Sequence, residues 1–342
     1  MKIVIAPDSY KECLSSREVA ATMAEAALQV CPSAEVVQIP LADGGEGTLD
    51  VLTWALDAKV HEARVSDPLG RTIDARFATL GDTGIIEVAQ ACGLNLLAPK
   101  ERNPIIASSR GVGELIMEAY GRGCRRIVIG LGGSATCDGG AGMLAVPGVR
   151  DVLREATVEL LCDVDNPFTG PEGAARVFAP QKGASPADVE ILESRMAEFA
   201  RGIAAETGVD VSSIPGAGAA GGLGGALIAY ADAEMTSGVD RVMLFTHFDA
   251  AIKDADIVFT GEGRSDSQTL NGKVPYGVLR HCRGKKVALL SGMVDASAMG
   301  ALYGAGFWAV RAVTPEDMPT VVAMGPEVAK QNIFSAVIRI LS

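Results

Sequence analysis

The sequence is poor in the residues that build zinc sites and disulfide frameworks. It contains only three histidines, and its seven cysteines are odd in number and never spaced as C-x-x-C. Structural zinc is usually held by closely spaced cysteines and histidines, and a disulfide framework needs cysteines in pairs. We therefore expect free thiols, no zinc and a reducing, cytoplasmic location.

Long apolar runs and an excess of positive charge are also absent. The start of the chain, residues 1–8, has too short an apolar run for a signal peptide, and no later run approaches the roughly 18 apolar residues of a membrane span. The 42 acidic residues outnumber the 30 basic ones, giving a net charge of -12. This balance argues against nucleic acid or an anionic membrane as a partner. We expect a small-molecule substrate and a monomer or homodimer.

Glycine, by contrast, is abundant, with 40 residues, many of them in four clusters at residues 43–47, 130–140, 216–225 and 261–266. Each cluster carries or borders acidic or hydroxyl side chains. Glycine loops let backbone N–H groups close around a polyanion, and nearby carboxylates can hold the cation that accompanies it. The combination predicts a nucleotide phosphotransferase. The cations in or near the glycine-rich segments are Lys11, Arg110, Lys182, Arg264 and Lys273.

Two common nucleotide motifs do not account for these clusters. A Walker A loop is absent, because the Gly272-Lys273 pair is followed by valine instead of serine or threonine. Residues 130–135 formally fit the dinucleotide fingerprint G-x-G-x-x-A, with Glu155 at the expected distance. Residues 216–221 fit it equally well without a clear strand before them. An NAD-linked oxidoreductase therefore stays open as an alternative function.

Strands and helices alternate at both ends of the chain. The pattern predicts strands at 2–6, 35–39, 256–259 and 286–290, and helices at 15–30, 46–56, 274–282 and 327–341. The first helix begins with a capping box formed by Ser15 and Glu18. This β-loop-α order is typical of an α/β fold with a parallel, doubly wound sheet.

The middle of the chain has a different pattern. Residues 61–65 and 71–80 flank an Asp-Pro-Leu-Gly turn and predict an antiparallel hairpin, and Ser185 caps a long helix that ends at Gly208. We therefore expect two domains. Residues 1–61 and 255–342 would form a Rossmann-like parallel-sheet domain, and residues 62–254 an inserted mixed α/β domain. The segment at 215–225 is either a hinge or a close-packed backbone crossing.

Eight segments, in order along nearly the whole chain, resemble the bacterial glycerate kinases of the first type. The segments are 5–12, 42–48, 108–115, 132–142, 162–167, 180–184, 215–222 and 260–268. The resemblance implies transfer of the γ-phosphoryl group of ATP to D-glycerate with Mg²⁺, in a cleft between two domains. It favours the 2-hydroxyl, although nothing in the residues fixes which hydroxyl reacts. The chain is shorter than the family between Gly142 and Cys162, and a non-catalytic hydroxy-acid sensor is a further alternative.

Phosphoryl transfer needs charge neutralisation on the transferred phosphate. The predicted phosphate contacts are the backbone amides of Gly132 and Gly133 and the hydroxyls of Ser134 and Thr136, with a tight strand-to-helix turn as the alternative reading. The nucleotide contacts predicted in the fourth cluster are Gly261, Glu262 and Gly263. Mg²⁺ takes oxygen ligands and keeps several waters, so one or two carboxylates suffice. The predicted metal ligands are Asp138, Asp163 and Asp266, each of which could instead be a helix cap.

The acid substrate also needs a cation and a base. A guanidinium binds a carboxylate in a bidentate way, and Arg110 stands at a predicted helix start where the dipole also favours an anion. Lys11 is predicted to bridge substrate or phosphate, or else to pair with Asp8. Either Asp8 or Asp43 would accept the hydroxyl proton, and the sequence does not choose between them. Asp43 is also a further candidate for the metal.

Overall fold

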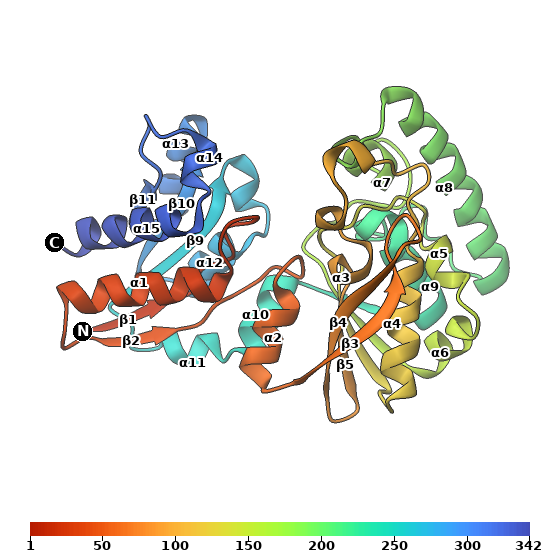
Figure 1. Cartoon of the computed structure of the whole chain (residues 1–342), viewed down its shortest axis with the longest axis horizontal. Helices are drawn as coiled ribbons and strands as arrows, with labels where there is room; N and C mark the ends of the chain where they lie inside the picture. Colours follow the sequence, from red (N-terminus) through yellow and green to blue (C-terminus); the bar gives the residue numbers. More distant parts are fainter. The chain divides into compact units, whose positions relative to one another are not determined.

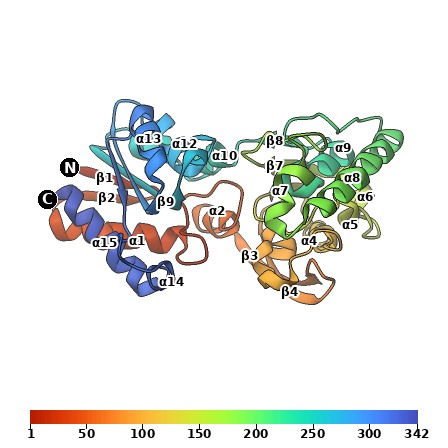
Figure 2. The ribbon, with the colours of Figure 1, turned by 90° about the horizontal axis from the view of Figure 1, so that it is seen from above.

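The computed structural model describes all 342 residues. The chain forms two compact α/β units, shown in Figures 1 and 2. The terminal unit consists of Met1–Asp43, Asp50–Ala55 and Val239–Ser342, and the inserted unit of Gly44–Leu49 and Leu56–Gly238. Helix α2 (Thr48–Leu56) belongs in part to each. The expected fold class, a parallel-sheet unit from both chain ends with a second mixed unit inserted, is confirmed. No helix is both long and apolar enough to cross a bilayer.

The terminal unit is built on a five-stranded, all-parallel sheet. Its strands are β1 (Lys2–Ile5), β2 (Glu35–Gln38), β9 (Ile257–Ser265), β10 (Lys286–Val294) and β11 (Ala309–Ala312), in the order β11-β10-β9-β1-β2. The chain adds β2 on one side of β1 and the later strands on the other side. The strand order therefore reverses between β1 and β9. In open α/β sheets, ligands bind outside the carboxyl ends of the strands at such a switch point.

Helices cover this sheet because its strands are apolar on both faces. Ile3, Val4 and Ile5 of β1 are fully buried, as expected for a central parallel strand. Helix α1 (Ser16–Val30) begins with the predicted capping box of Ser15 and Glu18, and runs alongside α15 (Pro326–Leu341) over one face of the sheet (Figure 1). The remaining helices of this unit are α10 (Gly238–Phe245), α11 (Phe248–Ile252), α12 (Val274–His281), α13 (Met299–Ala305) and α14 (Thr320–Ala323).

Helices α10 and α11 lie within the 62–254 range expected for the inserted domain, yet they pack with the terminal unit. The reason is a long-range contact. Val239 of α10 is fully buried, and its side chain lies directly against Gly277 of α12. The limits of the contact units therefore differ from the expected domain limits at residues 44–49, 56–61 and 239–254.

The inserted unit is built on a six-stranded mixed sheet in the order β3-β4-β5-β6-β7-β8. The strands are β3 (Lys59–Ser66), β4 (Thr72–Leu80), β5 (Thr83–Glu87), β6 (Arg126–Gly130), β7 (Thr157–Leu161) and β8 (Glu234–Thr236). The first three are antiparallel, including the predicted hairpin, and β5 to β8 are parallel. The helices are α3 (Ala89–Cys92), α4 (Arg110–Gly121), α5 (Ala141–Leu144), α6 (Val149–Glu155), α7 (Ala174–Phe178), α8 (Pro186–Thr207) and α9 (Leu223–Ala231).

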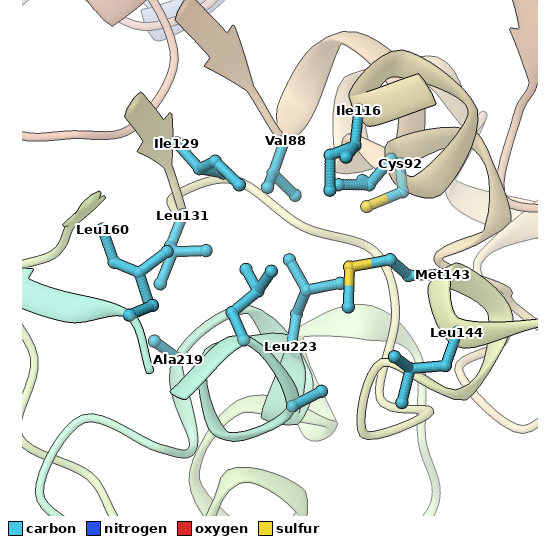
Figure 3. Close-up of a cluster of buried hydrophobic side chains, with 14 of the residues drawn as sticks. Val88, Cys92, Ile116, Ile129, Leu131, Met143, Leu144, Leu160, Ala219 and Leu223 are labelled. Carbon is cyan, nitrogen blue, oxygen red and sulfur yellow. The ribbon is translucent and has the colours of Figure 1, made fainter. Parts of the chain in front are cut away.

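The core of the inserted unit anchors the loop that follows β6. Leu131, directly after that strand, packs in one buried cluster with Leu160, Met143 and Leu223 (Figure 3). These four side chains come from β6's end, β7, α5 and α9. Their burial fixes the backbone entering the loop at residues 132–138, which the sequence predicts to bind phosphate. The predicted long helix is also confirmed as α8, capped by Ser185 and ended by Gly208 in the left-handed region.

The segment at 215–225 is a close-packed backbone crossing and not a hinge. It lies wholly inside the inserted unit. A Cβ built on Gly221 would lie 2.0 Å from the carbonyl oxygen of Thr136, and the amide of Gly139 donates to the carbonyl of Gly221 at 3.0 Å. Gly132 also lies close to another backbone segment, because its Cβ would lie 2.4 Å from the Cα of Gly45. The first three glycine clusters therefore meet at the loop after β6.

Candidate active site

The terminal unit has a pocket of about 330 Å³ at the loop that follows β1 and the carboxyl-terminal part of β9, at the switch point of its sheet. One part of its wall is charged, and the other is apolar. The charged residues are Asp8, Lys11, Asp43, Glu262, Arg264 and Lys273, and the apolar ones include Met293, Val313, Ala323, Met324 and Ala329. Three of the sequence-predicted catalytic residues and the fourth glycine cluster thus lie at one pocket. Lys273 and Arg264, which the sequence marked only as nearby cations, join them.

Asp8 is a deeply buried carboxylate of this pocket, with 4% of its surface exposed. It follows β1, and its Oδ1 accepts a hydrogen bond of 2.7 Å from the amide of Ser9. Burial, and after it the neighbouring carboxylate of Asp43, raises the pKa of Asp8 well above its ordinary value, while Lys11 acts in the opposite direction. A carboxylate with a raised pKa is suited to accept a proton near neutral pH.

Glu262 lies inside β9 and not in a loop, since β9 continues to Ser265 beside β10. Its Oε1 accepts hydrogen bonds from Ser265 Oγ at 2.8 Å and Thr269 Oγ1 at 2.6 Å. Its Oε2 lies 3.3 Å from Lys273 Nζ. Glu262 is therefore held on both oxygens, and it places the ammonium group of Lys273 at the pocket.

Asp266 occupies a capping position. Its Oδ1 accepts the amide of Gln268 at 2.8 Å, at the start of the short 3₁₀ turn Ser267–Leu270. The Nζ of Lys273 lies 4.0 Å from the same carboxylate. Asp266 thus has the geometry of a cap, which the sequence left open, beside one of the pocket cations.

In the inserted unit, the loop after β6 holds Gly132, Gly133, Ser134 and Thr136 together with a lysine from a distant segment. The amide of Gly132 donates to the carbonyl of Gly44 at 3.0 Å, and Gly133 is exposed with a φ of +77°. Lys182 Nζ donates to Ser134 Oγ at 2.9 Å and to the carbonyl of Thr136 at 2.7 Å. Sequence reasoning named Lys182 only as a nearby cation, because 48 residues separate it from Ser134.

Asp138 and Arg110 both have protein partners. Asp138 accepts hydrogen bonds from the amide and hydroxyl of Ser109, at 2.8 and 2.9 Å, and from the amides of Gly140 and Gly142. The two bonds from Ser109 tie the loop to the start of α4, and the two from Gly140 and Gly142 hold the start of α5, as a capping carboxylate does. Arg110 begins α4, is exposed, and donates from Nε to Glu114 at 2.8 Å. The third predicted metal ligand, Asp163, is half-buried in the segment after β7.

The carboxylates differ in how well they fit a metal. No group of three or more His, Cys, Asp or Glu side chains has the arrangement of a metal site. Asp138 already accepts four hydrogen bonds, so its oxygens are largely used. Asp8 and Asp43 fit Mg²⁺ better, because two neighbouring carboxylates leave negative charge that a divalent cation would neutralise.

The dinucleotide fingerprint has no support in the fold. A Rossmann phosphate-binding loop leads directly into a helix whose N-terminus faces the pyrophosphate. After residues 130–135, the next helix, α5, begins only at Ala141 and has four residues. Glu155, expected at the ribose, instead accepts a hydrogen bond from Tyr120.

Comparison with known proteins extends the resemblance found in the motifs. The profile of the glycerate kinase family matches residues 3–153 and 145–342. The chain is 40% identical to glycerate kinase of Bacillus subtilis, over 93% of this chain and 92% of the relative. It is 42% identical to glycerate 2-kinase of Escherichia coli, over 81% of each chain. A crystal structure of a provisionally assigned glycerate kinase 2 from Salmonella typhimurium LT2 has a TM-score of 0.82 at 37% identity, covering 100% of this chain and 97% of that one.

Proposed function

The chain belongs to the glycerate kinase family, and from this premise we propose that it transfers the γ-phosphoryl group of ATP to D-glycerate, forming 2-phosphoglycerate and ADP. Membership makes the protein a phosphotransferase that acts on glycerate. The proposal adds ATP as the phosphoryl donor, the 2-hydroxyl of glycerate as the acceptor, and the residues that carry out the transfer. The observation that carries it is the switch-point pocket, where charged groups suited to phosphoryl transfer line one wall.

The pocket supports a nucleotide as one ligand, because it has two kinds of wall. Met293, Val313 and Met324 form apolar surface suited to a base, whereas glycerate has no apolar group of that size. Lys11, Arg264 and Lys273 bring positive charge for phosphates to the other wall. Gly261, Glu262 and Gly263 of β9 are then nucleotide-binding residues in this proposal.

The chemistry assigned to the carboxylates follows from their surroundings. Asp8 or Asp43 accepts the proton of the glycerate hydroxyl, and the raised pKa of Asp8 favours Asp8. Mg²⁺, when bound, would neutralise charge on the phosphates, and Asp8 and Asp43 fit it as ligands. Asp266, Asp163 and Asp138 stay in the proposal as the metal-ligand candidates that the sequence offers, although Asp138 and Asp266 have capping geometry.

The inserted unit contributes anion-binding groups in this proposal. The loop with Gly132, Gly133, Ser134 and Thr136 binds an oxyanion, and Arg110 binds the glycerate carboxylate. The exposed Gly133 and the buried cation behind Ser134 support the first assignment. The exposed guanidinium of Arg110, at the first residue of α4, supports the second.

The reaction is tested by incubating the purified protein with D-glycerate and MgATP. We expect ADP release in a coupled assay and a ³¹P NMR signal of 2-phosphoglycerate. A product identified as 3-phosphoglycerate would contradict the assignment of the hydroxyl. Binding of glycerate without ADP release would favour the sensor, and nicotinamide binding the oxidoreductase.

The metal assignment is tested by Asp266→Asn and Asp43→Asn. If both carboxylates neutralise metal-phosphate charge, kcat falls on the order of 10²-fold in each variant. The midpoint of thermal unfolding should hardly change, because asparagine keeps the shape of both side chains and, at Asp266, caps as well as aspartate does. A normal kcat in folded Asp266→Asn would mean that Asp266 only caps the 3₁₀ turn. A large fall in the unfolding midpoint would mean that the lower activity comes from loss of structure and not from loss of metal binding.

A further inference from the structure

Lys182 is a buried cation without an ion-pair partner. Only 3% of its surface is exposed, and it ends the 3₁₀ turn Pro180–Lys182. Its two hydrogen bonds go to neutral oxygens, Ser134 Oγ and the carbonyl of Thr136. The titratable groups that face it are Cys92, Cys137 and Asp138. A buried ammonium group whose charge is not paired is costly, so an anion bound nearby would be strongly favoured.

The nearest carboxylate does not remove this imbalance. Asp138 interacts with Lys182 electrostatically, without a hydrogen bond or ion pair between them. Its own hydrogen bonds go to Ser109, Gly140 and Gly142. Both cysteines are buried, and their sulfur atoms make hydrogen bonds with Thr136 Oγ1 and Met196 Sδ, not with the ammonium group. The positive charge of Lys182 behind the loop therefore has no ion-pair partner.

The lysine also determines what the Ser134 hydroxyl can do. An ammonium group only donates, so Ser134 Oγ must accept from Lys182. The hydroxyl proton is then left to donate elsewhere, and the protein offers it no acceptor. A donor polarised by a neighbouring cation binds an anion more strongly than a neutral donor does.

Backbone donors stand beside this hydroxyl. The loop is pinned on both sides of Ser134, because Ala135 donates to the carbonyl of Cys92 at 2.8 Å and Leu94 donates to the carbonyl of Gly133 at 2.8 Å. The amides of Gly133 and Ser134 have no acceptor within the protein. Gly133 is exposed, so a ligand can reach this turn from solvent.

We propose that Lys182 is a positioning residue for an oxyanion site at the Gly133–Ser134 turn, where it turns the Ser134 hydroxyl toward the ligand and supplies the counter-charge. The inference rests on the proposed function, since a kinase of glycerate handles two oxyanions. These are the carboxylate of glycerate and the phosphates of the nucleotide. The shared chemistry is a small group of negatively charged oxygens, bound by two amides, one hydroxyl and the charge behind them.

The test is calorimetric titration of wild type, Lys182→Met, Ser134→Ala and the double variant. The probes are sodium D-glycerate and a magnesium complex of a non-hydrolysable ATP analogue, with glyceramide and adenosine as their uncharged counterparts. Lys182→Met is expected to weaken binding of one anionic probe by about 10-fold or more, because hydrogen bonds to charged groups have that strength. Binding of the uncharged counterpart should change little. Weaker binding of glycerate would identify its carboxylate as the oxyanion bound at this turn. Weaker binding of the nucleotide analogue would identify a phosphate group instead.

The double variant separates positioning from a structural role. If Lys182 acts through Ser134, the two losses are not additive, and the double variant binds about as weakly as Lys182→Met alone. Lys182→Arg should restore part of the affinity. Lys100→Met, at an exposed lysine of the same unit, is the matched control and should bind normally. Thermal midpoints identify variants that merely unfold, and Ser134→Ala, which creates no buried charge, provides the test if Lys182→Met does not fold.

Two results overturn the inference. One is unchanged binding of both anionic probes by folded Lys182→Met, and the other is additive losses in the double variant. Wild-type turnover of D-glycerate is measured in parallel. If the wild type is active while Lys182→Met binds normally, only this inference fails. If the wild type binds the probes but releases no ADP, the proposed function fails instead.

Discussion

Replacing Asp8 by asparagine is expected to lower kcat by about 10³-fold, within the range that a general base contributes, while the protein stays folded. Asp8 lies at the end of β1 in the switch-point pocket, almost fully buried beside Asp43. Asparagine keeps the shape but cannot accept the proton of the glycerate hydroxyl or neutralise a cation. Steady-state kinetics with D-glycerate and MgATP measure the change.

The same variant should be at least as stable as wild type at neutral pH. The pKa of Asp8 is raised in the folded state, so the folded protein binds this proton more tightly than the unfolded chain does. The charged form therefore destabilises the fold, and this effect grows as pH rises from the ordinary aspartate value through the raised pKa. Asparagine removes it. The difference in thermal midpoint between Asp8→Asn and wild type should increase over that window and then level off.

Asp188→Asn is the matched control for both measurements. Asp188 completes the capping box of α8, and the hydrogen bonds from Ser185 hold its pKa below the ordinary value. Its stabilisation is present above the unfolded pKa and is lost as pH falls through the folded pKa, the reverse of Asp8. We expect normal kcat and a slightly lower midpoint at pH 7. Near-normal kcat in folded Asp8→Asn would remove Asp8 from the mechanism.

Replacing Gly221 by alanine should destabilise the protein by about 3 kcal/mol or more. Its φ is +67°, which is strained for any residue with a Cβ, and that Cβ would lie 2.0 Å from the carbonyl oxygen of Thr136. This carbonyl group accepts a hydrogen bond from Lys182 and lies in a packed part of the core. It therefore cannot move aside without further loss of stability. Denaturant unfolding, with the slope compared between variants, measures the loss.

Gly202→Ala provides the comparison within the same unit. Gly202 lies inside α8, and a Cβ there meets nothing within 4 Å. Alanine at such a helical position should stabilise the protein by roughly 0.5–1 kcal/mol. If Gly221→Ala were as stable as wild type, the backbone crossing would have to be looser than the structure has it.

Features that depend on residues close together in the chain could be predicted from the sequence alone. Capping boxes at Ser15 and Ser185, the hairpin turn and the β-loop-α order depend on local hydrogen bonds and on apolar periodicity, so one segment is enough to predict each of them. The ordered motifs also predicted the glycerate kinase family. Asp8, Lys11, Asp43 and Glu262, which the sequence offered as candidate site residues, line one pocket because they follow or end parallel strands that meet at one sheet edge.

Contacts between groups that are distant in the chain could not be predicted in this way, because they depend on folding. Lys182 reaches Ser134, and Gly221 crosses Thr136, through contacts between segments that are far apart in the chain. The capping role of Asp138 depends on Ser109, 29 residues earlier. Helices α10 and α11 joined the terminal unit because Val239 is buried against Gly277. A glycine or a charged residue has the same local pattern in a hinge, a cap or a binding loop, so its role is fixed by the packing and hydrogen bonds that folding brings to it.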